Sequence, residues 1–427
     1  MRRVILLPIV LYILTACTPA EPQILQAEVE RIIGTLASDE MKGRRTFSPE
    51  IDLASDFISG EFERIGLQKW DGLDSYKQEF YVFNFTVDSL VVKTDGKSLG
   101  MASATTTSEN ISWTEESNVA SVFVGEKDTL QRTYGRYRRA GENVILWIHP
   151  AHQQLYTRYA SFLATGSRTM TRAGGSTIVF AISESKPELF SVEFTASVTE
   201  LPLANVVGYI EGNRKDEYVL FSAHYDHIGI QRPVEGDSIA NGANDDASGS
   251  TAVIMLADYF KAKSKPERSL LFVTFTAEEI GGYGSRYFSQ QLDPDKIVAM
   301  FNIEMIGKPA TDGPNSAWIT GFDKSDFGQI LQKSVEGTEY KFYPDPYPTE
   351  NLFYRSDNAT LARLGVPAHS ISTTPIDVDP DYHQVSDEVK TLNLEHLANT
   401  IKAISAGAAT IISGEATPTR VNPANVN

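Results

Sequence analysis

The pattern of hydrophobic and polar positions changes twice along the chain, after a short apolar leader. Residues 25–38 and 48–67 repeat apolar side chains every three or four positions, the spacing of an amphipathic helix. Ser48 precedes the second repeat and is a candidate N-cap. We therefore expect the region 25–80 to be helical.

The region 81–202 has a different pattern of residue types. Short runs of β-branched and aromatic residues are separated by Gly, Asn, Asp and Ser, which is typical of strands. It holds no dense cluster of His, Asp and Glu, and we interpret His149 and His152 as surface or packing residues. The pattern predicts a mostly β inserted domain, with strands near 85–94, 118–125, 143–150 and 176–183.

Strand-like and helix-like segments alternate in the region 203–415. Such alternation predicts an α/β fold in which helices cover both faces of a mainly parallel sheet. Residues 416–427 are expected to be a flexible tail. The expected strands are 217–223, 269–276, 297–305 and 368–372, and the expected helices are 248–263 and 392–412.

Composition and charge exclude some partners. The 427 residues include 41% hydrophobic and 22% charged side chains, which is ordinary for a folded protein. The formal net charge of −17 argues against nucleic acid or an anionic membrane surface as the main partner, because both attract basic surfaces. We expect no nucleic-acid binding.

The leader reads as an export signal. Arg2 and Arg3 precede an apolar run that is too short to span a bilayer, and small residues follow before Cys17. The only cysteine of the chain lies at this point, so no intramolecular disulfide can form.

The leader also resembles a bacterial lipoprotein signal. That resemblance implies a signal peptide over 1–16, lipidation of Cys17 and a short tether over 17–24, with plain secretion as the alternative. It implies an exported, membrane-anchored protein of the cell envelope, on the outer membrane or the periplasmic side.

Candidate metal-binding side chains stand where predicted strands end. His224 follows 217–223, Glu278 and Glu279 follow 269–276, and Glu304 lies at the end of 297–305. The carboxyl ends of parallel strands form binding sites in open α/β sheets. We therefore expect these side chains to meet in one site.

Asp245 and His383 complete a set of two imidazoles and three carboxylates, with His224, Glu279 and Glu304. Zinc takes nitrogen and carboxylate oxygen ligands, and two neighbouring metals need a bridging group between them. The set is large enough for each of two metals to have one His, one carboxylate of its own and a shared Asp.

Five segments, in order, carry a family resemblance. The region 203–412 resembles the co-catalytic zinc peptidases, which include bacterial leucyl aminopeptidases, glutamate carboxypeptidase II and, more distantly, glutaminyl cyclases. The segments are SAHYDHIG (222–229), GANDDASG (242–249), TAEEIGG (276–282), FNIEMIG (301–307) and DYHQVSDE (381–388).

The resemblance assigns roles residue by residue. His224 and Glu304 would bind one zinc ion, and Glu279 and His383 would bind the other. Asp245 would bridge the two ions. Asp226 would orient the imidazole of His224, and Glu278 would be the general base.

The chain departs from the family pattern at two places. Glu304 stands where the family usually has Asp; the extra methylene keeps the ligating carboxylate but leaves the zinc ion that Glu304 would bind less secure than the other. Ser356, Asp357 and Asn358 stand where relatives often have His in the third place, and they are expected to line the substrate pocket.

Other polar residues near these segments are given structural interpretations. We interpret His227 as a polar loop residue and Asp246 as a structural residue at the start of the following helix. His369 lies in an apolar stretch and is interpreted as a core or pocket-wall residue. No partner is assigned to His396.

The resemblance implies a zinc-dependent exopeptidase acting on peptides, first of all an aminopeptidase. Carboxypeptidase or dipeptidase action and glutaminyl cyclisation on the same fold are alternatives. A binding ectodomain without catalysis, as in transferrin receptors, is a further one. The region 81–202 would be a lid or a substrate-selecting wall, or a domain similar to protease-associated domains.

Overall fold

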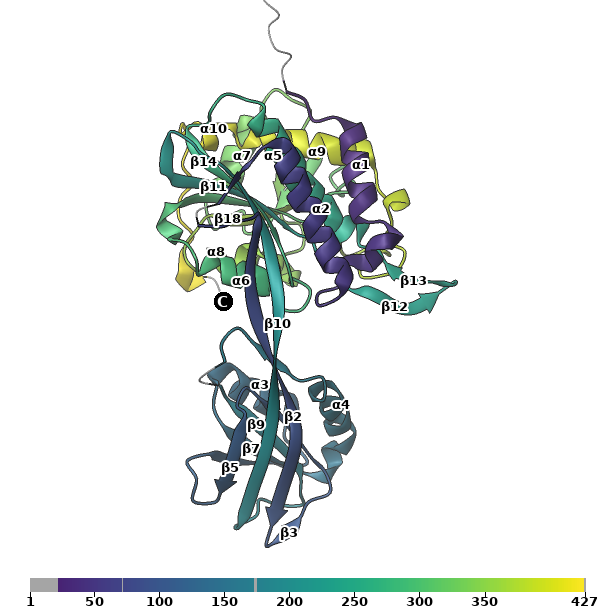
Figure 1. The fold of residues 1–427 in the computed structure, drawn as a ribbon, viewed down its shortest axis with the longest axis vertical. Helices are drawn as coiled ribbons and strands as arrows, with labels where there is room; N and C mark the ends of the chain where they lie inside the picture. Colours follow the sequence, from purple (N-terminus) through teal and green to yellow (C-terminus); the bar gives the residue numbers. More distant parts are fainter. Residues whose placement is uncertain (1–21, 71, 173–174, 426–427) are drawn as a thin grey trace, which may run out of the picture.

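The computed structural model describes residues 22–70, 72–172 and 175–425. A larger α/β domain and a smaller inserted domain are joined by a long two-stranded ribbon (Figure 1). The expected signal peptide and Cys17 lie outside the described residues. Within the described ranges, no helix is long and apolar enough to cross a membrane.

The larger domain is built on a mixed sheet with a parallel centre, so the predicted α/β fold is confirmed. β11 pairs in parallel with both β14 and β15, and β15 pairs in parallel with β18. The flanks differ, because β10 is antiparallel to β14 and β16 is antiparallel to β18. The bounds are β11 (Arg214–His224), β14 (Arg268–Phe275), β15 (Ile297–Ile303), β16 (Ser316–Ile319), β17 (Lys341–Pro344) and β18 (Ala368–Ser372).

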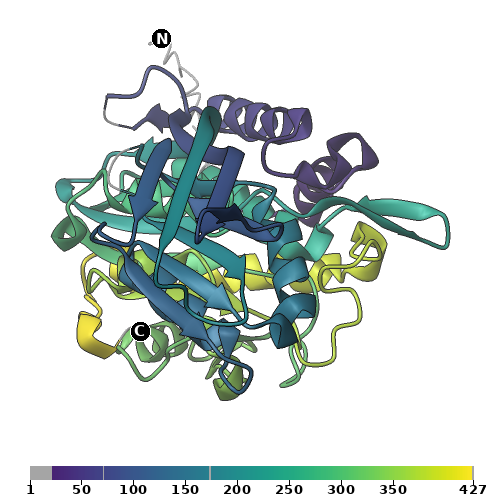
Figure 2. The same ribbon diagram turned by 90° about the horizontal axis from the view of Figure 1, so that it is seen from below.

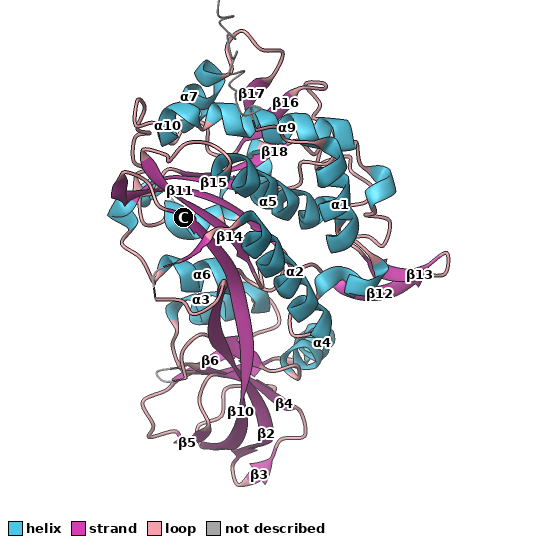
Figure 3. Ribbon diagram, turned by 45° about the horizontal axis from the view of Figure 1, so that its top comes forward, coloured by secondary structure: helices cyan, strands magenta, loops and turns pink. Residues whose placement is uncertain are grey.

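Helices cover both faces of this sheet (Figure 3). Alternate side chains of β11 point to opposite faces, as a strand requires. Val219 and Phe221 pack in one hydrophobic cluster, and Leu220 packs in the other. The first cluster takes in α1 (Gln26–Leu36), α2 (Pro49–Ile65), α5 (Ser248–Lys261), α7 (Phe327–Ser334), α9 (Leu394–Gly407) and α10 (Ala409–Ile412), and the second takes in α6 (Tyr283–Ser289) and α8 (Asn358–Ala362).

The ribbon consists of β2 (Lys77–Thr94) and β10 (Phe190–Ile210). The two strands pair antiparallel from Val206 opposite Lys77 to Phe190 opposite Thr94, with one bulge. The expected domain boundaries near 80 and 202 therefore fall inside continuous strands. Short strands pair along this ribbon: β1 (Gln68–Lys69), β3 (Lys97–Ser98), β5 (Asn110–Thr114) and β8 (Ser167–Thr169).

The inserted domain contains helices that the sequence interpretation did not predict. β6, β7 and β9 run parallel, and parallel neighbours need crossover connections, which α3 and α4 provide. Figure 2 shows this domain end on. The domain has more strand than helix, in keeping with the mostly β prediction, but α3 and α4 were not expected. Its elements are β4 (Ala102–Thr106), β6 (Ala120–Val124), α3 (Leu130–Ala140), β7 (Val144–Ile148), α4 (Gln153–Leu163) and β9 (Thr177–Ile182).

The C-terminal segment packs against the larger domain up to residue 425, contrary to the expected flexible tail. The guanidinium of Arg268 donates to the carbonyl oxygen of Ala416 and to the hydroxyl of Thr417. Val421 is buried, and its N–H donates to the carbonyl oxygen of Gly365. These contacts fix the segment against the larger domain, beginning beside the first residue of β14. A hairpin, β12 (Gly229–Val234) and β13 (Asp237–Ala240), projects from the other side (Figure 1).

Candidate metal centre

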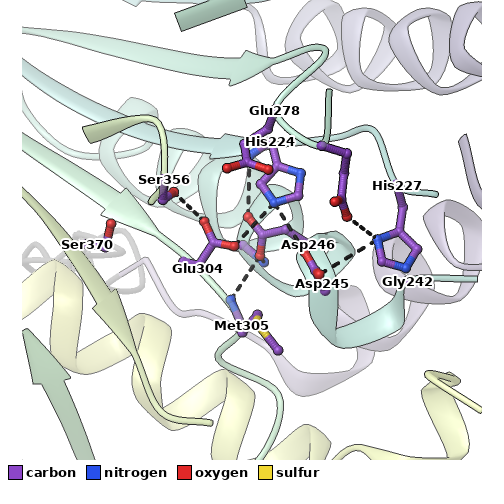
Figure 4. Close-up of polar contacts among 12 residues, drawn as sticks. His224, His227, Gly242, Asp245, Asp246, Glu278, Glu304, Met305, Ser356 and Ser370 are labelled. Atoms are coloured by element: carbon purple, nitrogen blue, oxygen red, sulfur yellow. Dashed lines mark hydrogen bonds and ion pairs between the residues drawn. The ribbon is translucent and has the colours of Figure 1, made fainter. Parts of the chain in front are cut away.

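The predicted site residues meet at the carboxyl ends of the parallel strands. His224 ends β11, Glu278 and Glu279 follow β14, and Glu304 follows β15. Asp245 lies in the turn before α5, as Figure 4 shows. The fold therefore gathers side chains from segments as far apart as those of His224 and His383 into one largely buried cluster.

His224, Asp245 and Glu304 form the first half of the cluster. His224 Nε2 lies 3.2 Å from Asp245 Oδ1 and 3.2 Å from Glu304 Oε1. Its Nδ1–H donates to the carbonyl oxygen of Asp226, which leaves the lone pair of Nε2 facing the two carboxylates. Burial lowers the pKa of His224, but the carboxylates of Glu304 and Asp245 outweigh it and raise this pKa well above its ordinary value.

The second half of the cluster contains two imidazoles. His383 Nε2 lies 3.2 Å from Asp245 Oδ2 and 3.2 Å from Glu279 Oε2. Hydrogen bonds to these carboxylates raise the pKa of His383 to about 10. His227 Nδ1 lies 2.8 Å from Glu279 Oε1, so the interpretation of His227 as a loop residue outside the site is wrong.

Asp226 acts differently from the sequence expectation. The imidazole of His224 bonds to its backbone carbonyl, and its carboxylate Oδ1 is 3.8 Å away from that ring. The carboxylate instead accepts the backbone N–H groups of Glu278 and Glu279, at 3.0 and 3.3 Å. One buried residue thus orients a ligand candidate and fixes the loop that carries the candidate base.

Two further aspartates hold the turn that contains Asp245. Asp387 accepts the N–H groups of Asn244 and Asp245, at 2.9 and 3.0 Å. Asp246 accepts the N–H groups of His224, Gly249 and Met305, which matches its structural interpretation. Asp387 was not singled out from the sequence, although it lies in the segment of His383.

A buried arginine from the N-terminal region clamps the same loops. Arg44 is 0% exposed and donates to the carbonyl oxygens of Tyr225, Asn241 and Gly242. A fourth bond goes to the carbonyl oxygen of Leu36. The sequence showed only a polar loop here, because nothing in the local pattern separates a buried arginine from an exposed one.

Glu278 faces a cavity of about 100 Å³ beside the cluster. Burial raises its pKa well above the ordinary value, and the neighbouring carboxylates of Glu304 and Asp357 act in the same direction. A carboxyl group with a raised pKa can both accept and release a proton near neutral pH. The lining of the cavity also includes large apolar and aromatic side chains, those of Met305, Trp318, Leu352, Ile376 and Tyr382.

Only part of the segment 356–358 lines this region. The hydroxyl of Ser356 donates to Glu304 Oε2 at 2.5 Å and faces the cavity. Asp357 is buried and lines an adjoining pocket, and burial raises its pKa to about 7. Asn358 instead donates to the carbonyl oxygens of Phe353 and Ala368 in the interior, so its expected place in the pocket is wrong.

The donor atoms fit a pair of zinc ions. Imidazole nitrogen and carboxylate oxygen are zinc's preferred ligands in sites of this kind. Glu279 Oε1 and both ring nitrogens of His227 are buried without a hydrogen-bond partner, whereas buried polar atoms are normally satisfied. A cation at this place would supply the missing partner. Glu304 is long enough to bring its oxygen to the imidazole of His224.

Two groups of three side chains could each hold an ion, and both contain Asp245. They are His224, Asp245 and Glu304, and His227, Asp245 and Glu279.

Comparisons with known proteins agree with this geometry. Residues 205–408 match the model of peptidase family M28. Leucine aminopeptidase 2 of Trichophyton rubrum is 25% identical over 229 residues, which cover 47% of this chain and 43% of that protein. The match thus spans less than half the length of this curated relative.

Solved structures share the fold. An aminopeptidase from Aneurinibacillus sp. strain AM-1 superposes with a TM-score of 0.54 at 20% identity and covers 95% of this chain and 96% of its own. A zinc aminopeptidase from Bacillus subtilis gives a TM-score of 0.56 at 16% identity and covers 92% and 97%. At these identities the likeness establishes the mixed α/β architecture.

Proposed function

Because residues 205–408 form a domain of peptidase family M28, we propose that this chain is a zinc-dependent aminopeptidase. The observation that carries the proposal is the shared position of Asp245 between two groups of zinc-ligand atoms, with Glu278 beside them. We assign His224 and Glu304 to one ion, Glu279 and His383 to the other, and Asp245 to both.

Glu278 has the central part in the chemistry. Bound zinc would supply the Lewis acidity that makes water a usable nucleophile near neutral pH and polarises the scissile carbonyl. Glu278 takes the proton from the attacking water and delivers it to the leaving amine. The carboxylate of Asp226 keeps the Glu278–Glu279 backbone in place through two N–H bonds, so the base stays in position.

The cavity suits the amino end of a peptide. A free α-amino group can be held by a bound zinc ion, which accepts nitrogen ligands, and by the carboxylate of Glu278 beside it. The apolar part of the lining, which includes Trp318, suits an apolar first side chain. We therefore prefer aminopeptidase to carboxypeptidase or dipeptidase action.

The test compares substrates and metal states. The purified protein should release the first residue of leucyl-anilide and should leave N-acetyl-leucyl-anilide intact. Chelation should abolish this activity, and added zinc should restore it. A protein that cyclises Gln-initiated peptides without hydrolysing the anilide would instead be a glutaminyl cyclase. A protein inactive on both substrates at full zinc load would support a binding ectodomain.

The inserted domain is proposed to be a wall that selects substrates. The ribbon that carries this domain packs close to the loop of Glu278. Phe80 and Leu203 of the ribbon cluster with Ala277, the residue before Glu278. A second cavity of about 260 Å³ lies between the two parts, with Tyr134 and Phe162 on one side and Ile280 and Tyr283 on the other.

The export signal and Cys17 support a further proposal, that the protein is a lipoprotein of the cell envelope. The described chain begins at residue 22, at the end of the larger domain away from the inserted domain (Figure 1). A tether at this end would hold the catalytic domain by the face opposite the inserted domain.

A further inference from the structure

His227 lies in the metal cluster but belongs to no assigned ligand set. Its Nδ1 is 2.8 Å from Glu279 Oε1 and 3.8 Å from Asp245 Oδ2. In Figure 4, Asp245 lies between His224 and His227, which approach it from opposite sides. The imidazole therefore lies beside the same two carboxylates that His383 contacts.

Ordinary hydrogen bonding does not account for this contact. Both ring nitrogens of His227 and the nearby Glu279 Oε1 are buried, and none of the three has a hydrogen-bond partner of acceptable geometry. Unpaired buried polar atoms are rare in folded proteins. Two of them, His227 Nδ1 and Glu279 Oε1, face each other and indicate a missing partner between the imidazole and the carboxylates.

The ring is held firmly against the backbone. Gly242 has a φ of +57°, and a Cβ there would lie 2.5 Å from Cγ of His227. On its other side the backbone of His227 bridges to Arg45, and its N–H donates to the carbonyl oxygen of Arg44. The imidazole is thus fixed before any ligand arrives, which lowers the entropy cost of binding.

We propose that His227 is a ligand of the second zinc ion, an inference that rests on the proposed zinc function. The second ion then has two imidazoles, His227 and His383, together with Asp245 and Glu279. The first ion has one imidazole, His224. The two imidazoles also differ in exposure, because the side chain of His383 is 39% exposed and that of His227 is fully buried.

The two sites are therefore unequal. Imidazole is a strong zinc ligand, and carboxylate-rich sites accept harder metals more readily. The site with two imidazoles takes zinc first and holds it more tightly, while the site with Glu304 exchanges its metal more easily.

X-ray absorption spectroscopy of the unmutated protein tests the ligand count directly. With both sites loaded, three imidazoles shared by two ions give an average of about 1.5 imidazoles per zinc. A chain in which only His224 and His383 bind gives about 1.0. The first value is the expected result, and the second overturns the inference without relying on any variant.

Variants test the role of His227 itself. Zinc affinity is measured by competition with a chelating dye, and thermal unfolding of each metal-free variant checks the fold. His227→Ala and His383→Ala should each weaken the tighter zinc by about 100-fold or more, a loss at least as large as that seen for outer-shell partners. His152→Ala in the inserted domain is the matched control and should change nothing.

His227→Asn separates ligation from positioning. The amide can still bond to Glu279 from a place near that of Nδ1 but is a poor zinc ligand. Affinity restored by His227→Asn, or kept within threefold in His227→Ala, overturns the inference and leaves the proposed function standing. A wild-type protein that binds no zinc contradicts the proposed function and the inference together.

Discussion

At the scale of single residues, the proposed base Glu278 and its neighbour Glu279, a proposed zinc ligand, have different surroundings. Glu278 faces the cavity with a raised pKa, while Glu279 faces the imidazoles. Two adjacent glutamates therefore have different surroundings, and the turn after β14 sets them apart.

Glu278→Gln should retain zinc and lose activity. The amide keeps the size of the side chain but cannot accept the proton, so kcat should fall by about 10²–10⁴-fold. Metal analysis and steady-state kinetics on leucyl-anilide measure the two effects separately. Full activity in this variant would contradict the assignment of Glu278 as the general base.

His369 provides a residue-scale test of pH dependence. Its Nδ1–H donates to the carbonyl oxygen of Thr320, and Ser325 lies 2.7 Å from Nε2, which places it in the core as expected. Burial lowers its pKa to about 4, below the ordinary value of 6.5. The unfolded chain then binds the proton first, so stability is present above pH 6.5 and is lost as pH falls towards 4.

The expected contribution of His369 is about 2 kcal/mol between pH 7 and pH 5. Urea unfolding of the metal-free protein at both pH values should show that His369→Gln loses less stability on acidification than the wild type. His149→Gln, in the inserted domain, is the control and should behave as the wild type does. Equal losses in His369→Gln and the wild type would contradict a neutral buried imidazole.

At the scale of elements, the short segment 39–46 makes several of the contacts that hold the loops of the candidate site. Arg44 bonds to three carbonyls in the two loops that carry the ligands. Thr46 donates to the carboxylate of Asp226 at 2.9 Å. The segment lies outside the region 205–408 that matches the family, yet it fastens that region's metal-binding loops.

Replacing Arg44 should therefore weaken both the fold and the metal site. Arg44→Met leaves buried carbonyls unpaired and removes a buried charge, which costs about 3–5 kcal/mol. Thermal unfolding and zinc competition should both show the loss. Arg45→Met is the matched control, because Arg45 is exposed and its side chain can be replaced with little effect. A stable, zinc-tight Arg44→Met protein would show that the clamp is dispensable.

Elements with strong periodicity were predictable from the sequence. The strand 368–372 and the helix over 248–261 lie where the pattern placed them, because the surrounding sheet agrees with their local preference. α3 and α4 were missed. Their Arg- and Tyr-rich helical faces lie between short strands, and the strand signals dominated the interpretation of the region.

At the scale of the whole molecule, the ribbon of β2 and β10 sets the place of the inserted domain. The ladder runs from the main sheet outwards with a single bulge, so the two parts are linked by backbone hydrogen bonds instead of a flexible linker. The inserted domain is thereby held near the catalytic cavity, in keeping with its proposed role in selecting substrates.

The proposed lipid anchor is also a property of the whole molecule. Cys17→Ser should move the protein from the membrane fraction to the soluble fraction of a bacterial host and abolish labelling with a radioactive fatty acid. Thr18→Ala keeps the cysteine and is the control. Continued labelling of the Cys17→Ser protein would contradict the proposal.

The sequence by itself determined the fold class and the order of chemical groups. Strand ends carry His224, Glu279 and Glu304 because side-chain type and strand position are local properties, readable one segment at a time. The tertiary structure alone decided which distant groups meet. In the folded chain Arg44 is buried, His227 lies beside Glu279, and Asp387 accepts a hydrogen bond from the N–H of Asp245. Those contacts join segments far apart in the chain, and no local pattern encodes them.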